Sequence, residues 1–491
     1  MKKLQKYGIA LLAMGAFSLS GCTDSAPSAP APSLGSTTVT KYVAVGNSLT
    51  AGYQSNGLYA SAQAYSYPNL IAAQLKLAGA TIGTFEQPTW PDPGNPVSAT
   101  STIASRYVII SLADPENPII GPAGESITAT QPSNATLPRP YDNLGLPGAP
   151  LAGFMDTVGT YQGALAPAII RAAGGLPKSQ FQQVVALHPD VVTFWLGAND
   201  VLGFATTGGV SPSAPTNAGI FDALYLQAIG SLRAALPNAK IIVATIPDVK
   251  AVPFFTTVNP KVAPSLAALN ADLYFQQHGE TGPGTGKTRL TGEYAPLITL
   301  KASTYAALLG QPTGKWYRDL AASLGAPVAA VIGAGIDTTK PFGVYPTNPF
   351  PDALVLDSTE QVMANVAIAA FNTTIKNVAA ANNAKVFDAF TFFNNVKLHG
   401  YSVAGETFTT DYLTGGLFSL DGVHPSSRGY AIVANQFILT MNSAYSMNIP
   451  YVDVSSIPGI PAPLGKYIAG KVVPSIPLSA FKNFESLFRA D

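Results

Sequence analysis

The sequence predicts an α/β protein built around a mostly parallel β-sheet. From residue 38 onward, short apolar stretches alternate with longer stretches of helical periodicity, which is the pattern of strands joined by crossover helices. Two of the apolar stretches, residues 191–196 (VVTFWL) and 241–246 (IIVATI), are compact and rich in β-branched side chains. Such runs are typical of parallel strands that are buried on both faces of a sheet.

The expected elements define one elaborated domain over residues 38–491. We expect strands at residues 39–45, 191–196, 241–246 and near Val386, and helices at residues 67–77, 221–236, 360–380 and about 427–443. Two segments, near residues 81–140 and 251–350, do not follow the alternation. Long irregular segments in an α/β protein are either insertions over the ligand-binding edge of the sheet or decoration elsewhere. The sequence favours neither alternative.

The composition supports a large folded core and argues against a nucleic-acid partner. Hydrophobic residues make up 47% of the 491-residue chain, which is enough to bury an extensive core. Only 11% of the residues are charged, and 27 basic residues balance 27 acidic ones. Without a basic excess, the chain has little attraction for the phosphates of nucleic acid or for another anionic surface.

The N-terminus predicts export and a lipid anchor. Three lysines in the first six residues precede an apolar stretch, residues 7–17, that is too short to span a bilayer, so we assign residues 1–21 to a signal peptide. Cys22 is the sole cysteine, which excludes internal disulfide bonds and a cysteine-based metal site. The Leu-Ser-Gly-Cys sequence that ends at Cys22 resembles the lipobox of bacterial lipoproteins, in which the cysteine is acylated. The alternative is an ordinary signal peptide with an incidental cysteine.

The segment after this cysteine has the composition of a tether. Residues 22–37 are rich in Pro, Ala and Ser, and they contain too few large apolar side chains to form a core. The expected location is therefore the bacterial cell envelope, on the outer membrane or at the cell surface. The membrane is the expected partner of the lipid anchor.

A serine stands where the first expected strand ends. Gly46, Asn47 and Ser48 follow this strand directly, which places Ser48 beyond a strand's carboxyl end, where open α/β sheets bind ligands. Gly46 allows a tight turn, and the next backbone N–H groups can face a developing oxyanion. Serine in a glycine turn is common, so this motif alone is weak.

A carboxylate and an imidazole lie close together near the C-terminus, at Asp421 and His424. A serine hydroxyl becomes a good nucleophile when an imidazole takes its proton, and a carboxylate fixes the tautomer of that imidazole. A separation of three residues lets both side chains reach one place from a single loop. A chance Asp-x-x-His sequence before a helix explains the pair equally well.

Two further motifs supply candidate oxyanion donors. Asn199 follows the strand expected at residues 191–196, so its side-chain amide would lie at the same edge of the sheet as Ser48. Gly148, in residues 143–149 (NLGLPGA), could present a backbone N–H without a side chain in the way. Taken separately, each of these motifs is explained by a turn or a helix cap.

In this order the four motifs resemble those of the SGNH, or GDSL-type, hydrolase family. The resemblance implies a three-layer α/β/α fold with a mostly parallel central sheet and long loop insertions. It implies that Ser48 is the nucleophile and that Asp421 and His424 complete a catalytic triad. It also implies an oxyanion hole made by the N–H groups of Ser48 and Gly148 and the amide of Asn199. The resemblance covers about five short blocks and none of the segments between them.

One position departs from the family pattern, because the usual Gly-Asp-Ser is Gly46-Asn47-Ser48 in this chain. The missing carboxylate is not a member of the triad, so we expect changed local hydrogen bonding without loss of activity. Gly145 competes with Gly148 for the oxyanion role. We favour Gly148 because a small residue follows it.

The predicted function is hydrolysis of carboxylic esters through an acyl-enzyme on Ser48, without a cofactor. The first candidate substrate is a lipid-like ester with an apolar acyl group, and the second is an acetylated glycan. A third alternative is a non-catalytic surface-binding lipoprotein on a retained hydrolase scaffold.

Neither a nucleotide site nor a metal site is expected. Residues 282–288 (GPGTGKT) match a phosphate-binding loop only in part, because Thr281 stands where the pattern requires glycine and no buried strand precedes it, so we expect a flexible loop. His188, His278 and His399 show no spacing typical of metal ligands. Calcium held by loop oxygens is the alternative that the sequence leaves open.

Overall fold

The central sheet determines where the functional motifs meet. In the computed structural model, five strands form one entirely parallel sheet in the order β11-β6-β5-β1-β4. These strands are β1 (Tyr42–Gly46), β4 (Asn143–Gly145), β5 (Val191–Trp195), β6 (Lys240–Ala244) and β11 (Lys385–Phe387). The structure describes residues 30–98, 100–114, 116–292, 295–460 and 474–481. The predicted signal peptide, Cys22 and the first half of the predicted tether, residues 22–29, lie outside the described residues.

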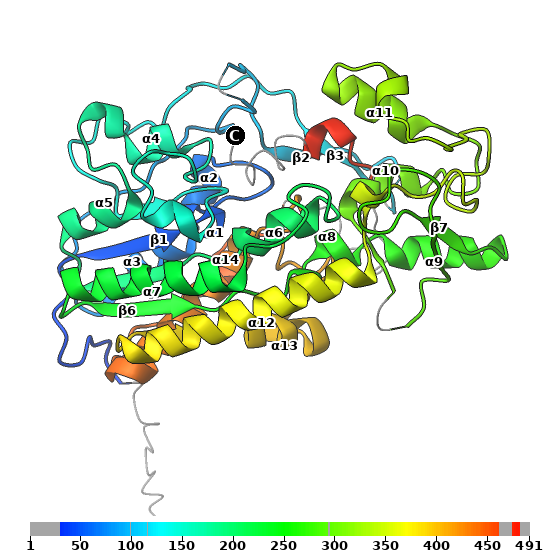
Figure 1. Ribbon diagram of the computed structural model, residues 1–491. Coiled ribbons are helices and arrows are strands. Elements are labelled where there is room, and N and C mark those ends of the chain that lie inside the picture. Colours follow the sequence, from blue (N-terminus) through cyan, green and yellow to red (C-terminus); the bar gives the residue numbers. More distant parts are fainter. Residues whose placement is uncertain (1–29, 99, 115, 293–294, 461–473, 482–491) are drawn as a thin grey trace, which may run out of the picture. The chain divides into compact units, whose positions relative to one another are not determined.

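Helices cover both faces of this sheet (Figure 1). The ring of Phe194 in β5 packs edge-on against Tyr225 of α7 (Ala218–Ala235), with ring centroids 5.8 Å apart. The next residue, Trp195, packs against α3 (Tyr67–Leu77) and α14 (Ser427–Tyr445) instead. Successive side chains of a strand point to opposite faces, so α7 lies on one face and α3 and α14 lie on the other. The predicted three-layer α/β/α arrangement with a parallel sheet is confirmed.

The order of the strands changes direction at β1. The chain places β4 on one side of β1 and then adds β5, β6 and β11 on the other side. In open α/β sheets, ligands bind beyond the carboxyl ends of the strands at such a switch point. The end of β1, where Ser48 follows, is therefore the position in this sheet at which a ligand is expected.

The remaining elements connect the core or extend beyond it. The other α-helices are α1 (Ser48–Ala51), α2 (Ala60–Gln63), α4 (Ala166–Ile170), α5 (Gln180–Leu187), α6 (Asn199–Thr206), α8 (Pro253–Thr256), α9 (Asn259–Ala268), α10 (Ser303–Ala306), α11 (Lys315–Leu324), α12 (Ser358–Ala381) and α13 (Ala389–His399). Antiparallel pairs are formed by β2 (Tyr107–Ser111) with β3 (Ile119–Pro122), β7 (Leu273–Phe275) with β8 (Gly286–Thr288), β9 (Leu297–Ile298) with β10 (Val355–Leu356), and β12 (Tyr401–Val403) with β13 (Glu406–Phe408). Residues 282–288, expected to be a loop, thus include a strand, because β8 pairs with β7.

Both irregular segments reach the edge of the sheet that carries Ser48. Residues 81–140 contribute Ser105, whose backbone carbonyl accepts a hydrogen bond of 3.1 Å from the side chain of Asn56. Residues 251–350 contribute Phe254, whose N–H donates to the carbonyl of Gly422 at 2.9 Å. The structure therefore favours insertion over the ligand-binding edge rather than decoration elsewhere.

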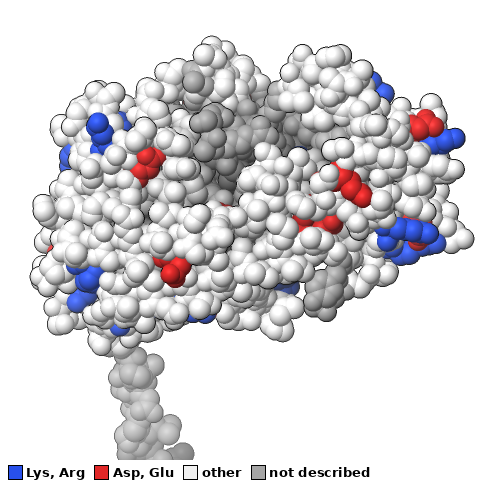
Figure 2. Space-filling view, viewed as in Figure 1, with Lys and Arg blue, Asp and Glu red and all other residues white. Residues whose placement is uncertain are grey.

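The surface carries few charges, as the composition implies. On the face drawn in Figure 2, acidic and basic side chains are sparse and scattered among uncharged residues. No helix within the described part of the chain is long and apolar enough to cross a membrane.

Candidate active site

Ser48, His424 and Asp421 form an unbroken hydrogen-bonded chain. The Nε2 atom of His424 lies 2.8 Å from Ser48 Oγ, and its Nδ1 atom lies 3.0 Å from Asp421 Oδ2. All three residues are at most 2% exposed. When Asp421 is ionised it accepts the hydrogen bond from Nδ1–H, so that Nε2 carries no proton and can accept the hydroxyl proton of Ser48.

The turn after β1 presents Ser48 at the start of a short helix. A Cβ atom on Gly46 would lie 2.8 Å from the backbone oxygen of Trp195, so this position accommodates only glycine. Asn47 caps α1, because its side-chain oxygen accepts the N–H of Leu49 at 3.1 Å. Aspartate, the family's usual residue at this position, could make the same capping hydrogen bond. The asparagine of this chain therefore preserves the turn. The N–H of Ser48 itself has no acceptor among the described residues.

The carboxylate of Asp421 is held by four donors. Its Oδ1 atom accepts the backbone N–H groups of Val423 and His424 at 2.9 and 2.8 Å. Its Oδ2 atom accepts the imidazole proton of His424 and, at 2.9 Å, the backbone N–H of Asn56. Burial alone would raise the pKa of Asp421, but His424 and these N–H groups outweigh burial and hold the pKa below its usual value.

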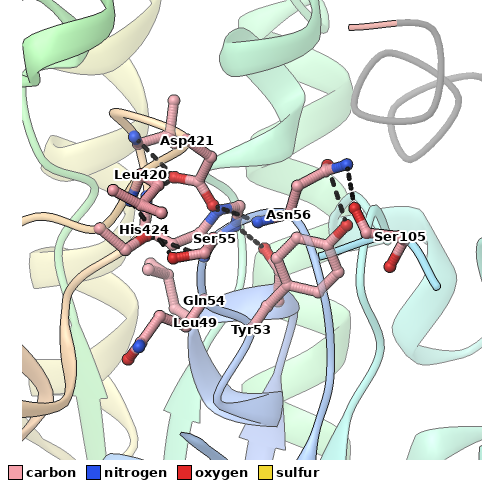
Figure 3. Close-up of polar contacts among 12 residues, drawn as sticks. Leu49, Tyr53, Gln54, Ser55, Asn56, Ser105, Leu420, Asp421 and His424 are labelled. Carbon is pink, nitrogen blue, oxygen red and sulfur yellow. Dashed lines mark hydrogen bonds and ion pairs between the residues drawn. The ribbon is translucent and has the colours of Figure 1, made fainter. Parts of the chain in front are cut away.

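A second loop, residues 53–56, positions the loop that carries Asp421 and His424 (Figure 3). The N–H of Ser55 donates to Ser419 Oγ at 2.9 Å, and the N–H of Leu420 donates to Ser55 Oγ at 3.3 Å. Asn56 adopts a left-handed backbone conformation, with φ of 62°, and in this conformation its N–H donates a hydrogen bond to Asp421. The ring of Tyr53 packs against His424 with centroids 4.8 Å apart. Sequence reasoning missed this loop, although Ser-Asn-Gly at residues 55–57 is a turn signal.

The two predicted oxyanion donors lie on adjoining loops. Asn199 begins α6 and donates one N–H of its side chain to the carbonyl of Ala149 at 3.0 Å, so its second N–H is left for a ligand. Gly148, which precedes Ala149, has a φ of 83° and an N–H without an acceptor among the described residues.

Gly145, the competing glycine, has a structural role instead. Its N–H donates to the side-chain oxygen of Asn143 at 3.0 Å and is therefore already engaged. A Cβ atom at Gly145 would lie 2.2 Å from the backbone nitrogen of Ala51, so this glycine lets β4 pack directly against α1. Of the two glycines, Gly148 is the one whose N–H can bind an oxyanion.

Asp200 holds the loop that carries Gly148 in place, a role that sequence reasoning missed. Its carboxylate accepts the N–H of Leu151 at 2.8 Å and the hydroxyl of Thr216 at 3.0 Å. Asp200 is 5% exposed, and burial raises its pKa to about 6. An acidic residue in the first turn of a helix is common, which is why its position in the sequence carried no signal.

An apolar pocket of about 620 Å³, part of it open to solvent, lies beside the nucleophile candidate. Ser48, Asn199 and His424 form part of its wall. The rest of the wall is mostly apolar and includes Leu202, Ile246, Val252, Phe393, Phe418 and Val423. The pocket thus offers space for an apolar group next to the hydroxyl of Ser48.

Comparison with known families agrees with this geometry. The family model for GDSL-like lipases and acylhydrolases matches residues 42–437, which include each residue of the hydrogen-bonded chain. The chain belongs to this family. It is therefore a hydrolase that acts on esters. A search of curated protein sequences finds no match.

Two solved structures are similar at a low level. One is a variant of an acetyl-xylooligosaccharide esterase from Geobacillus, with 12% identity, a TM-score of 0.31, and coverage of 82% of this chain and 94% of that chain. The other is an acetyl xylan esterase, with 14% identity, a TM-score of 0.30, and coverage of 81% and 98%.

The raised pKa of Asp200 predicts a specific effect of pH on stability. The folded protein holds the carboxyl proton of Asp200 more tightly than the unfolded chain does. The stabilisation of the fold by this proton is therefore present below about pH 4 and is lost as the pH rises through about 6. Asparagine does not titrate. Between pH 4 and pH 7, the difference in the free energy of unfolding between Asp200→Asn and the parent should therefore shift by about 2 kcal/mol in favour of the variant.

Urea unfolding at pH 4, 5, 6 and 7 measures this difference. A second variant, Asp222→Asn, alters a carboxylate that accepts an exposed hydrogen bond from Thr374 and serves as the control. A difference between Asp200→Asn and the parent that stays constant with pH would contradict the assignment.

Proposed function

We propose that the protein is a serine esterase that forms an acyl-enzyme on Ser48. The observation that carries this proposal is the hydrogen-bonded chain from Ser48 through His424 to Asp421. His424 Nε2 takes the hydroxyl proton while Ser48 Oγ attacks the ester carbonyl carbon, and it then gives that proton to the departing alcohol. Water attacks the acyl group next, His424 takes a proton from the water, and this proton returns to Ser48 as the acid leaves.

The proposed oxyanion hole consists of two backbone N–H groups and one amide. The N–H groups of Ser48 and Gly148 have no acceptor among the described residues, and Asn199 keeps one amide N–H available. Donors of this kind stabilise the negative charge that develops on the carbonyl oxygen, and each typically contributes a factor of about 10² to 10³ to the rate. Asp200 would act only indirectly, by holding the loop of Gly148 in place.

The substrate class that the pocket favours is an ester with an apolar acyl chain longer than acetyl. The wall beside Ser48 presents aliphatic and aromatic side chains and few polar groups. An acetyl group would leave most of this apolar surface in contact with water, whereas a longer chain would cover it. The alternative, removal of acetyl groups from a glycan, would make little use of this pocket.

The proposed location is the outer membrane or the cell surface, with Cys22 as the site of lipid attachment. The motivation is the lipobox-like sequence before Cys22 and the tether composition of residues 22–37. Cys22→Ala should release the protein from the membrane fraction of a bacterial host into the soluble fraction, and metabolic labelling with a fatty acid should be lost. Unchanged membrane association and labelling would contradict the anchor.

A fluorophosphonate probe tests the catalytic role of Ser48. The probe should label the folded parent at one site, because only a serine activated by a neighbouring base reacts rapidly with it. Ser48→Ala should abolish labelling and reduce ester turnover by a factor of about 10⁴ or more. The matched control is Ser265→Ala, which alters an exposed serine of α9 and should label like the parent. Two results would contradict the esterase proposal and favour the non-catalytic alternative. These are labelling of Ser48→Ala equal to that of the parent, and no labelling of the parent.

A series of p-nitrophenyl esters tests the acyl group. From acetate to hexanoate, kcat/KM should rise about fourfold for each methylene added, because each CH₂ group buried is worth about 0.8 kcal/mol. Val252→Phe should narrow the pocket and lower the ratio of hexanoate to acetate activity by about tenfold. Activity confined to acetate in the parent would favour the deacetylase alternative.

A further inference from the structure

Three side chains outside the Ser48 pocket converge on one point. His278, Asp352 and Glu360 each offer a ligand atom, and these atoms all lie within 4.8 Å of one another. His278 follows β7, Asp352 begins the 3-10 helix η6 (Asp352–Leu354), and Glu360 lies in the first turn of α12. Because 82 positions separate His278 from Glu360, this cluster has no recognisable spacing of metal ligands in the sequence.

Asp352 carries a buried carboxylate oxygen. Asp352 is 5% exposed, and its Oδ2 atom accepts the N–H of Gly279 at 2.9 Å. Its Oδ1 atom is buried and accepts no hydrogen bond while Glu360 is ionised, whereas a protonated Glu360 would donate a hydrogen bond to Asp352. A buried carboxylate oxygen costs free energy unless a proton or a cation compensates it. The buried Oδ1 atom is therefore suited to bind a cation.

The surroundings of the cluster add negative charge. Asp357 is 2% exposed and accepts the backbone N–H groups of His278 and Glu360, which places a third carboxyl beside the cluster. Glu360 is fully buried. Among the ion pairs of the described residues, none joins Asp352, Asp357 or Glu360 to a lysine or arginine. Among the described residues, the group that can offset this negative charge is His278, and only when it is protonated.

Gly209 packs against the cluster without a side chain to cover it. The cluster also adjoins a cavity. A Cβ atom on Gly209 would lie 2.1 Å from Glu360 Oε1 and 3.0 Å from His278 Nδ1, so glycine keeps these two atoms accessible. His278 and Asp352 also line a cavity of about 1020 Å³ that is partly open to solvent. Water in this cavity can reach an ion held by the cluster.

We propose that His278, Asp352 and Glu360 bind a divalent transition-metal ion, with Zn²⁺ as the best-matched ion. The 3.1 Å between His278 Nδ1 and Glu360 Oε1 fits two ligands of one ion, because atoms about 2.1 Å from a tetrahedral centre lie about 3.4 Å apart. An imidazole together with two carboxylates suits Zn²⁺ or Mn²⁺, whereas Ca²⁺ and Mg²⁺ prefer oxygen ligands alone. Water from the cavity completes the coordination.

The ion would act as a cross-link and not in the esterase reaction. It would join the insertion that carries His278 to α12, a helix of the core, through ligands from three separate segments. None of the three ligands lines the pocket beside Ser48. Metal binding is therefore testable without any ester and independently of the proposed function.

Titration calorimetry with ZnCl₂ on the full chain, after removal of metal with EDTA, tests the site. We expect one Zn²⁺ per chain with a Kd below about 1 µM, weaker binding of Mn²⁺, and a rise in Tm of about 3 °C at saturation. His278→Ala and Asp352→Asn should each weaken Zn²⁺ binding at least about tenfold. His399→Ala, which alters a histidine outside the cluster, should bind Zn²⁺ like the parent.

Two results would overturn the proposal. Absence of heat from binding at 100 µM Zn²⁺, on the order of 100 times the expected Kd, would mean that the carboxyls are neutralised by protons instead. Unchanged binding by both His278→Ala and Asp352→Asn would place the ion elsewhere, for example at His424. Circular dichroism of each metal-free variant shows that it is folded. His278→Ala should pass this test, since the side chain of His278 is already 29% exposed.

Discussion

The buried carboxylate of Asp421 is the contact on which the rest of the site depends. A charged group that is 1% exposed is costly to bury, and here the cost is offset by three backbone N–H groups and one imidazole. One of those N–H groups belongs to Asn56, in the segment that also carries Ser48. The same carboxylate therefore orients His424 and attaches its loop to the segment of the nucleophile.

The sheet supplies the fixed base on which these loops meet. Strand order reverses at β1, so the turn after this strand faces the loops that follow both of its neighbours, β4 and β5. Glycines at positions 46 and 145 allow backbones to approach where any side chain would collide. The two long insertions then contact the loops from outside, through Ser105 and Phe254. The edge of the sheet and the two insertions thus hold Ser48 and His424 together, although 376 positions separate these residues in the sequence.

Four strands of the central sheet and four long helices that cover it could be predicted from the sequence, and the contacts that orient the site could not. The helix Tyr67–Leu77 has the same bounds in the structure as in the sequence prediction, and Ser66 caps its N-terminus. Strand β4 was missed because Asn-Leu-Gly has no β-branched residue and no apolar run. Asn56 was missed because it acts through its backbone N–H, which leaves no pattern of side chains. The roles of Ser48, Gly148 and Asn199 stay predictions drawn from their motifs.

The most direct test of the account is a crystal structure of the protein after reaction with a fluorophosphonate. The account predicts phosphorus bonded to Ser48 Oγ and one phosphonyl oxygen about 2.7 to 3.1 Å from the nitrogens of Ser48, Gly148 and the Asn199 amide. The alkyl group should then lie against Val252 and Phe418 in the apolar pocket. A phosphonyl oxygen directed away from these nitrogens, or an adduct on another residue, would contradict the account.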